Sequence, residues 1–300
     1  MGSNIVSLLK ENGYLDIITK NRSDLDLLNQ RDTEQFFKQE RPDNVICAAA
    51  KVGGILANQN FPVNFLYENL NIQNNIIHSS YKFNVRSLIF LGSACIYPKY
   101  AHQPIKENSL LSGNLEATNE AYAIAKIAGL KLCEAYSRQY NKKFISIMPN
   151  NLYGPNDNFS STNSHVIPAL IKKFHNAKSN SEEAVQIWGS GKPLREFLHV
   201  RDLCSAILVI MKDSNINKLL KFDSYHINIG SGEEISVKDL ALLIGEITEF
   251  PGQIYFDSSK PDGTPRKLLD STIIKGLGWR PKITLREGIR NLYSWYINNL

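Results

Sequence analysis

The sequence has little cysteine. Only four cysteines occur in 300 residues, and no two of them form a C-x-x-C pair. This spacing excludes a disulfide framework and gives no zinc-binding pattern, so we predict no metal site. A reducing compartment, the cytoplasm, is the expected location. The four residues are Cys47, Cys95, Cys133 and Cys204.

Long apolar runs and blocks of like charge are also lacking. No apolar stretch approaches the roughly 20 residues that a membrane-spanning helix needs, and the first residues have no charged segment followed by an apolar one. The net charge is only +5, and no run of Lys and Arg is interleaved with aromatic residues. We therefore expect neither a membrane nor nucleic acid as a partner. A phosphorylated small molecule suits this charge balance better.

A complete glycine-rich loop is missing from the start. Met1-Gly2-Ser3 precedes an amphipathic helical pattern and resembles the end of a G-x-G-x-x-G loop, whose third glycine lies where a helix packs on a strand. We interpret Gly2 as that third glycine, with the first strand and two glycines absent. On this interpretation Met1 is an internal methionine, and roughly a dozen residues precede it in the full protein. The alternative is an irregular start before a helix.

Short apolar runs alternate with helical patterns through the first half. This order is typical of a parallel sheet covered by crossover helices. We predict an α/β fold with a doubly wound, Rossmann-like parallel sheet over residues 1–150. Residues 151–300 are expected to form mainly a smaller α+β lobe for substrate, with some segments returning to the sheet. The predicted strands are Leu15–Thr19, Asn44–Ala49, Ser87–Leu91 and Phe144–Pro149, and the predicted helices include 33–39, 64–81, 119–140, 165–175, 201–211, 236–248 and 286–298.

Tyr122 and Lys126 form the most specific local pattern. Residues four apart share one face of a helix, and an ammonium beside a phenol is expected to lower the phenol pKa from about 10. Such a pair is common on ordinary helix surfaces. Here, however, the strand 87–91 ends at Gly92-Ser93, at the sheet edge where parallel α/β proteins bind ligands. Ser93 is therefore expected to hydrogen-bond the same substrate oxygen as Tyr122.

A strand-end Ser followed by Y-x-x-x-K resembles the active site of the short-chain dehydrogenase/reductase superfamily. Longer blocks narrow this resemblance to the GDP-L-fucose synthase family, whose order they follow over essentially the whole chain. The resemblance implies epimerisation at C3 and C5 of GDP-4-keto-6-deoxy-D-mannose and then reduction at C4, giving GDP-L-fucose. The blocks are residues 48–55, 91–99, 148–155, 163–169, 195–200 and 260–267.

The C4 ketone acidifies the hydrogens on both C3 and C5, so one base and one acid serve both epimerisations. By resemblance Cys95 is the base and His165 the acid on the opposite face. Their reference pKa values, about 8.5 and 6.5, suit proton exchange near neutrality. Tyr122 then donates a proton to the C4 oxygen, Lys126 tunes Tyr122, and Ser93 holds the carbonyl. Without the family blocks, Cys95 would be interpreted as an inert buried thiol and His165 as a surface residue.

The cofactor preference is predicted from the end of the strand 15–19. A carboxylate there binds the ribose 2′-hydroxyl of NAD, whereas an Arg accommodates a 2′-phosphate. Arg22, with Lys20 close by, therefore favours NADP. Asn150 departs from the Thr that the family pattern has, and Ala94 replaces a second Ser. By resemblance the cofactor contacts also include Gly2, Leu91, Gly92, Ser93, Lys126, Pro149, Asn150, Asn151, Leu152 and His165.

For the GDP-sugar, the resemblance points to Lys173, Trp188, Arg195 and Asp262. An Arg grips a phosphate through parallel donors, and an aromatic plane covers a base or sugar. The family usually has Arg where Lys173 stands, so the charge is kept but the fork geometry is lost. Without context, Trp188 would be interpreted as a core or loop-filling residue.

Relatives pair through a bundle of two helices from each subunit, which predicts a homodimer through residues 64–81 and 119–140. Two alternatives stay open from the sequence. One is a non-catalytic remnant that keeps the dimer surface but holds no cofactor. The other is a sugar-nucleotide dehydratase or 4-epimerase of the same superfamily, although that chemistry does not require the pair Cys95 and His165.

Overall fold

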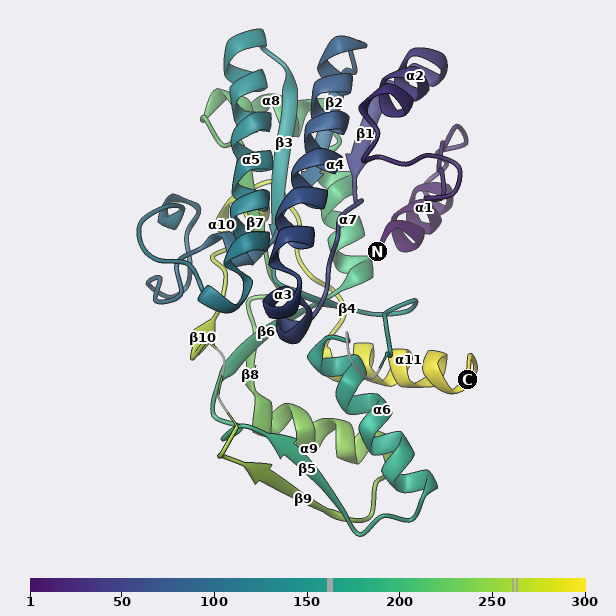
Figure 1. The fold of residues 1–300 in the computed structure, drawn as a ribbon, viewed down its shortest axis with the longest axis vertical. Coiled ribbons are helices and arrows are strands. Elements are labelled where there is room, and N and C mark those ends of the chain that lie inside the picture. Colours follow the sequence, from purple (N-terminus) through teal and green to yellow (C-terminus); the bar gives the residue numbers. More distant parts are fainter. Residues whose placement is uncertain (161–163, 261, 263) are drawn as a thin grey trace.

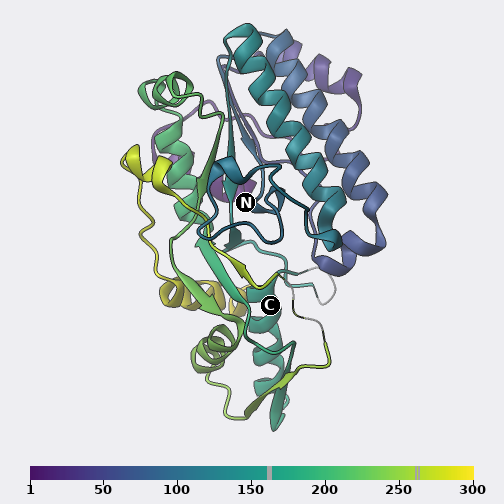
Figure 2. The same ribbon diagram turned by 90° about the vertical axis from the view of Figure 1, so that its left-hand side faces the viewer.

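The structure is a computed structural model that describes residues 1–160, 164–260, 262 and 264–300. It has an upper part built around a parallel sheet and a lower part of helices and short strands (Figures 1 and 2). The sequence blocks at 163–169 and 260–267 contain Asn163, Pro261 and Gly263, which lie outside the described residues.

The central sheet has the strand order β1-β2-β3-β7, and all neighbours are parallel. β2 is buried along its whole length, as expected when helices cover both faces of a parallel sheet. The expected α/β, Rossmann-like class is confirmed. The strands are β1 (Asn44–Cys47), β2 (Ser87–Leu91), β3 (Lys143–Pro149) and β7 (His226–Ile229).

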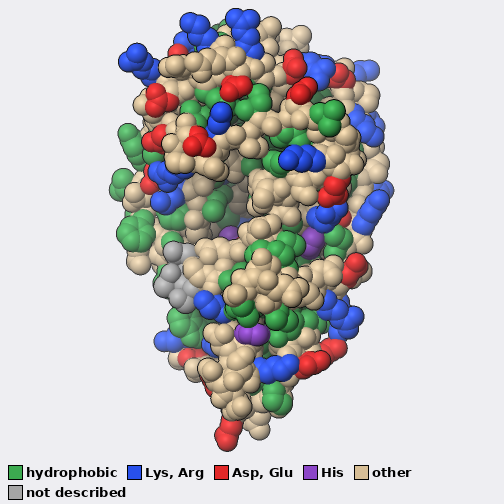
Figure 3. Space-filling model, turned by 90° about the vertical axis from the view of Figure 1, so that its right-hand side faces the viewer, with side chains coloured by type: hydrophobic (Ala, Val, Ile, Leu, Met, Phe, Trp, Pro, Cys, Tyr) green, Lys and Arg blue, Asp and Glu red, His purple; other side chains and the backbone are tan. Residues whose placement is uncertain are grey.

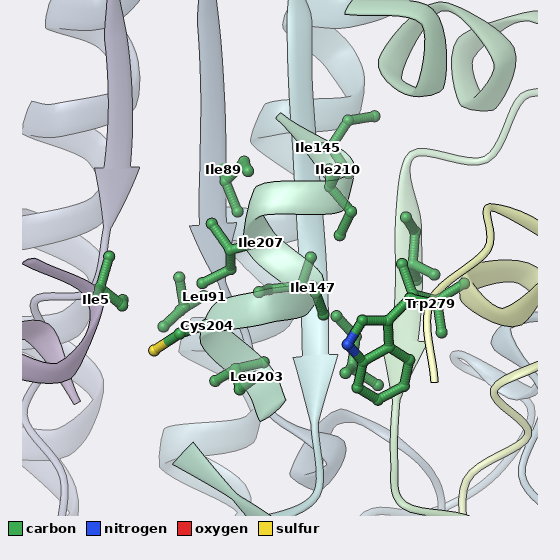
Figure 4. Close-up of a cluster of buried hydrophobic side chains, with 14 of the residues drawn as sticks. Ile5, Ile89, Leu91, Ile145, Ile147, Leu203, Cys204, Ile207, Ile210 and Trp279 are labelled. Carbon is green, nitrogen blue, oxygen red and sulfur yellow. The ribbon is translucent and has the colours of Figure 1, made fainter. Parts of the chain in front are cut away.

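Helices cover the two faces of this sheet. Leu88 and Phe90 of β2 pack with one group of helices, whereas Ile89 and Leu91 point to the other. Figure 4 shows Ile5 and the side chains of α7 around Ile89, Leu91 and β3. On the first face lie α2 (Gln30–Glu40), α4 (Pro62–Lys82) and α5 (Glu120–Tyr140), and on the second α1 (Gly2–Glu11), α7 (Val200–Ile210) and α8 (Asp213–Lys221).

The predicted strand Leu15–Thr19 is wrong. The segment has no strand hydrogen bonds, its Leu15 is 90% exposed, and its backbone is bonded only by Ile17 N to Leu15 O at 3.1 Å. A β-strand needs a neighbour to satisfy its backbone groups. No described strand lies beside residues 15–19, so a short apolar run alone does not produce one.

The long helices α4 and α5 match their predicted ranges within two residues at either end. Pro62 opens α4, where a missing N–H costs nothing. Asn141 ends α5 in the left-handed conformation, with φ of 53°. The two helices pack side by side, and Gln73 of α4 donates to the carbonyl of Ala125 of α5 at 2.6 Å. They therefore place the Tyr122 face at the sheet.

The lower part has its own core between helices and two short sheets. One sheet has the order β10-β6-β4, with β8 antiparallel to β6, and the other pairs β5 with β9. Helices α6, α9 and α11 pack around them. The elements of the lower part are β4 (Asn151–Tyr153), α6 (Val166–Ser179), β5 (Ala184–Trp188), β6 (Leu194–His199), β8 (Glu234–Ser236), α9 (Val237–Thr248), β9 (Gln253–Asp257), β10 (Arg266–Lys267) and α11 (Leu285–Ile297). Two short helices, α3 (Ile55–Asn60) and α10 (Thr272–Gly276), belong to the upper part.

Within residues 1–160, 164–260, 262 and 264–300, no helix has both the length and the apolar character needed to cross a membrane. In the same ranges, no three His, Cys, Asp or Glu side chains gather as metal ligands.

Candidate active site

The candidate site begins where β2 ends. Lys126 reaches from α5 and donates to the carbonyl of Leu91 at 2.8 Å. Gly92 follows, and a Cβ there would lie 2.4 Å from the sulfur of Met148, so a larger residue would have to displace the Met148 side chain. Ser93 then caps a short 3-10 helix, 94–96, by accepting from the Cys95 N–H at 3.2 Å. The tight turn thus presents Ser93 and Cys95 at the sheet edge.

Tyr122 lies beside this turn, but its pKa moves opposite to the prediction. Burial raises the Tyr122 pKa, the charge of the Cys95 thiolate raises it further, and a hydrogen bond with Ser93 opposes part of the rise. The Lys126 ammonium lies 5.9 Å from the Tyr122 ring centre and is bonded to Leu91 instead. The expected lowering by Lys126 is therefore wrong for the structure without ligand, and Tyr122 is a protonated phenol.

Lys126 is itself a buried charge. Burial lowers its pKa to about 8. Its other close contact is the Phe90 ring, 4.7 Å from Nζ. Because an ammonium has three N–H donors, and only one is bonded within the described ranges, two remain for a hydroxylated ligand. These free donors fit the ribose of a nicotinamide cofactor.

Two groups from distant segments contact the Cys95 thiol. Asn119 donates from Nδ2 to the sulfur at 3.3 Å, and Lys267 of β10 places Nζ 3.8 Å from it. The Asn119 side-chain oxygen is buried without a partner among the described residues. The sulfur is thus contacted by an amide N–H donor from one segment and by an ammonium from another.

His165 stands apart from this group. It is the residue before α6, it is exposed, and its ring makes no hydrogen bond or ion pair within the described part of the chain. The nearby Asp157 feels its charge, although burial is the larger influence and raises the Asp157 pKa. The carbonyl of Ser164 lies 3.6 Å from where a Gly54 Cβ would be, so His165 borders the loop that follows β1.

Gly2 and Arg22 are the residues predicted to contact the phosphates of the cofactor. Gly2 begins α1, and an added Cβ would meet nothing within 4 Å, so the close helix-to-strand packing expected there is not present. Arg22 is exposed and lies 3.8 Å from Glu68 of α4, which also lies 3.5 Å from Lys51. The expectation that both contact cofactor stays a prediction.

Asn150 and Asn151 follow β3 and turn inward. The Asn150 amide donates to Glu196 at 2.6 Å and to the Lys267 carbonyl at 3.0 Å, and the Asn151 amide donates to the Glu196 carbonyl at 2.9 Å. Asn150 is buried. Its side chain is engaged inside the protein, which the sequence did not indicate. Pro149 and Leu152 flank these residues on β3 and β4.

The predicted substrate residues lie along β5, β6 and the segment before β10. Trp188 is 63% exposed, with Lys260 5.8 Å from its ring centre. Arg195 donates to the Thr264 carbonyl at 2.5 Å, and Asp262 accepts from the Ser190 hydroxyl at 2.6 Å. Lys173 donates to the backbone carbonyl of Gln186. These contacts leave the Trp188 ring as an open plane.

A small cavity joins the thiol to this segment. Figure 3 shows the opposite side of the molecule, where the surface is also hollowed between the upper and lower parts. Lys99 binds Glu116 at 3.0 Å at the cavity wall. The sequence predictions missed Lys267, Asn119 and Glu116. Lys267 ends the sequence block 260–267, and Asn119 lies just before the pattern formed by Tyr122 and Lys126. The cavity is lined by Cys95, Tyr97, Pro98, Lys99, Ile105, Glu116, Thr264, Arg266 and Lys267.

The chain was compared with known proteins. Residues 1–230 match the model of the NAD dependent epimerase/dehydratase family. The chain is 52% identical over 304 residues to GDP-L-fucose synthase 1 of Arabidopsis thaliana, covering 100% of this chain and 91% of that protein. The chain belongs to the GDP-L-fucose synthase family.

Two further comparisons agree. The GDP-L-fucose synthase of Escherichia coli strain K12 is 48% identical, with 100% of this chain and 94% of that protein covered. A crystal structure of a GDP-L-fucose synthetase from Naegleria fowleri bound to NADP has a TM-score of 0.88 at 30% identity, covering 99% of this chain and 91% of that one. The resemblance, the fold class and the enzyme class predicted from the sequence are confirmed for this family member.

Proposed function

We propose that this chain carries out NADPH-dependent 3,5-epimerisation and 4-reduction of GDP-4-keto-6-deoxy-D-mannose, giving GDP-L-fucose. The observation that carries the proposal is the Cys95 site at the end of β2, where Asn119 and Lys267 contact a thiol beside Ser93 and Tyr122. Full-length identity to fucose synthases supports the substrate.

For epimerisation, the Cys95 thiolate removes the proton from C3 or C5. The C4 ketone makes these hydrogens acidic, and the resulting enolate carries its charge on the C4 oxygen. Ser93 and Tyr122 hydrogen-bond that oxygen, which stabilises the developing charge. His165 returns a proton from the opposite face, inverting the carbon. The Lys267 ammonium, 3.8 Å from the sulfur, attracts the thiolate while it is present.

For reduction, the raised pKa of Tyr122 matters. A protonated phenol is the state required to donate a proton to the C4 oxygen. NADPH, when bound, supplies the hydride to C4. Lys126 would hold its ribose with the two donors that Leu91 leaves free, and Arg22 its 2′-phosphate, while Gly2, Leu91, Gly92 and Pro149 to Leu152 border the same edge.

We further propose that Trp188, Arg195, Lys173 and Asp262 bind the GDP moiety. Trp188 offers the open ring, and Lys260 beside it adds positive charge for the diphosphate. Arg195 is partly buried and already held by Thr264, so its guanidinium is fixed before substrate arrives. Fixed cations bind a diphosphate with less loss of side-chain freedom.

The proposed assembly is a homodimer in the cytoplasm. Val63, Tyr67 and Ile124 expose apolar surface on α4 and α5, the helices expected to form a four-helix bundle. All four cysteines are free thiols in the structure, which suits a reducing compartment.

The test is incubation of the purified chain with GDP-4-keto-6-deoxy-D-mannose and NADPH in D₂O. We expect NADPH oxidation and a product with deuterium at C3 and C5. Cys95→Ser should lose the deuterium incorporation, because a serine hydroxyl is far less acidic than a thiol. Unchanged substrate and NADPH would refute the proposal, and a product altered only at C4 with recycled cofactor would indicate a 4-epimerase instead.

A further inference from the structure

Glu196 is a buried carboxylate to which the mechanism assigns no role. It lies on β6 and is fully buried, with an exposed fraction of 0%. No Lys or Arg pairs with it within the described ranges. Its Oε2 accepts from the Asn150 amide at 2.6 Å and from Leu269 N–H at 3.0 Å, and its Oε1 accepts from Gly232 N–H at 2.7 Å. A buried charge is thus satisfied entirely by N–H groups.

The donor set explains why this residue is a glutamate. All three partners are donors, and a carboxylate has acceptor positions on both oxygens. Glutamine would turn an NH₂ group toward one of these donors and leave it unpaired. Burial raises the Glu196 pKa, while the hydrogen bonds from Asn150, Gly232 and Leu269 oppose the rise. The neighbouring Gly230 also has no space for a side chain, since a Cβ would lie 2.3 Å from Oε1.

Two of the three contacts of Glu196 lead to one short segment. Glu196 holds Leu269 directly, and Asn150 links it to the carbonyl of Lys267 at 3.0 Å. The backbone is therefore fixed on both sides of Leu268. The same segment carries the Lys267 ammonium that lies 3.8 Å from the Cys95 sulfur.

Three cations line the cavity beside Cys95: Lys99, Arg266 and Lys267. In the described part of the chain, Lys267 is the one without a carboxylate partner. Lys99 pairs with Glu116 at 3.0 Å, and Arg266 pairs with Glu234 at 2.9 Å. The thiol is also faced by Tyr122 from α5 and by Asn119, which carry no charge near neutral pH. The position of Lys267 thus decides how much positive charge the thiol meets.

We propose that Glu196 is a positioning residue: with Asn150 it fixes the backbone of β10 so that the Lys267 ammonium stays beside the Cys95 thiol. Loss of this anchor would let the ammonium move away from the sulfur and make the thiol less reactive. The inference rests on the proposed role of Cys95 as base, but its test requires no turnover.

The test is alkylation of Cys95 by iodoacetamide in the full chain, followed across pH. The other three cysteines are buried, and Cys95→Ser shows which labelling belongs to Cys95. We expect Glu196→Gln to slow alkylation near pH 7 about three- to tenfold, because the Lys267 ammonium would no longer be held beside the sulfur that reacts. Lys267→Met should slow it at least as much.

Asp202→Asn is the matched control. Asp202 is also a buried carboxylate that accepts backbone N–H groups, from Lys282 at 3.0 Å and Ile283 at 3.0 Å, but in a different region. Its variant should leave the Cys95 pH profile unchanged. Circular dichroism establishes that each variant is folded.

Two results would overturn the proposal. One is a folded Glu196→Gln protein whose alkylation profile equals that of the parent. The other is an equal slowing by Glu196→Gln in the Lys267→Met background, because a residue acting through Lys267 must lose its effect there. If Glu196→Gln does not fold, Asn150→Thr replaces it, since a hydroxyl still donates to Glu196 but loses the link to the Lys267 carbonyl. If the variants leave Cys95 alkylation unchanged while the parent chain turns over substrate, the proposed function stands and only this inference is removed.

Discussion

At the scale of single residues, the candidate site places the Tyr122 phenol and the Cys95 thiol in different surroundings. The Tyr122 phenol keeps its proton because burial raises its pKa, whereas the Cys95 thiol is contacted by the Asn119 amide and the Lys267 ammonium. Reduction requires an acid and epimerisation requires a base. These different surroundings support the opposite roles that we propose for the two neighbouring side chains.

Tyr122→Phe should separate the two half-reactions. The phenol is the proton donor to C4, so we expect NADPH oxidation to fall about 10²- to 10⁴-fold. Deuterium exchange at C3 and C5 should persist, because Cys95 and His165 remain. Measuring both rates on the same sample checks this, and parallel loss of both would contradict the assignment.

Lys126→Met should stabilise the ligand-free protein in a pH-dependent way. The folded-state pKa of Lys126, about 8, is below its unfolded value of about 10.4. The unfolded chain therefore binds more protons between these pH values, and the parent gains stability as pH rises through them. At pH 7 the variant should be more stable by up to roughly 3 kcal/mol.

Urea unfolding of parent and variant at pH 7 and pH 10 measures this difference. We expect the gap in unfolding free energy to narrow at pH 10, where the parent lysine is neutral in the folded state although it is still mostly protonated in the unfolded state. A gap that is constant with pH would show that the buried ammonium carries no such cost.

At the scale of elements, side chains of helix α4 hold the loop after β1. Asn69 is buried and pairs with both backbone groups of Lys51: its Oδ1 accepts from the N–H at 2.9 Å, and its Nδ2 donates to the carbonyl at 3.0 Å. Asn58 of α3 similarly donates to the carbonyls of Gly53 and Gly54. The loop that borders His165 is thus fixed by side chains.

Asn69→Ala should lower the unfolding free energy by about 1–3 kcal/mol, since it leaves the backbone groups of Lys51 unpaired. Asn71→Ala is the matched control, because its amide only donates within α4, to Tyr67. We expect a change within about 0.5 kcal/mol for the control. If denaturant unfolding shows that both variants change the unfolding free energy equally, the contacts of Asn69 do not stabilise the loop.

The sequence predicted the helices and the residues on one helical face better than contacts between distant segments. The 3.6-residue period gives α4, α5 and the Tyr122–Lys126 pair directly. Lys267 lies 172 residues from Cys95, so no local spacing could place it there. Residues 15–19 are a short apolar run, but strand pairing depends on a neighbour that such a run does not report. The inward turn of Asn150 likewise depends on Glu196.

At the scale of the whole molecule, the exposed apolar surface of α5 gives a test of assembly. Ile124 is 44% exposed, and Leu242 of α9, 46% exposed, provides a control in the lower part. If α4 and α5 form the dimer bundle, Ile124→Arg should shift the protein to monomer in sedimentation velocity, because a charge would be buried at the interface. Leu242→Arg should keep the parent mass. A dimer in both variants would exclude this interface.

The pairing of β3 with β7 also sets an order of events during folding. Ser146 lies beside His226, and the intervening residues include all of β4, α6, β5 and β6. A nascent chain therefore exposes the edge of β3 until residue 229 has left the ribosome, and closure of such a long loop is intrinsically slow. The parallel sheet is thus completed only after β4, β5 and β6 of the lower part have been made.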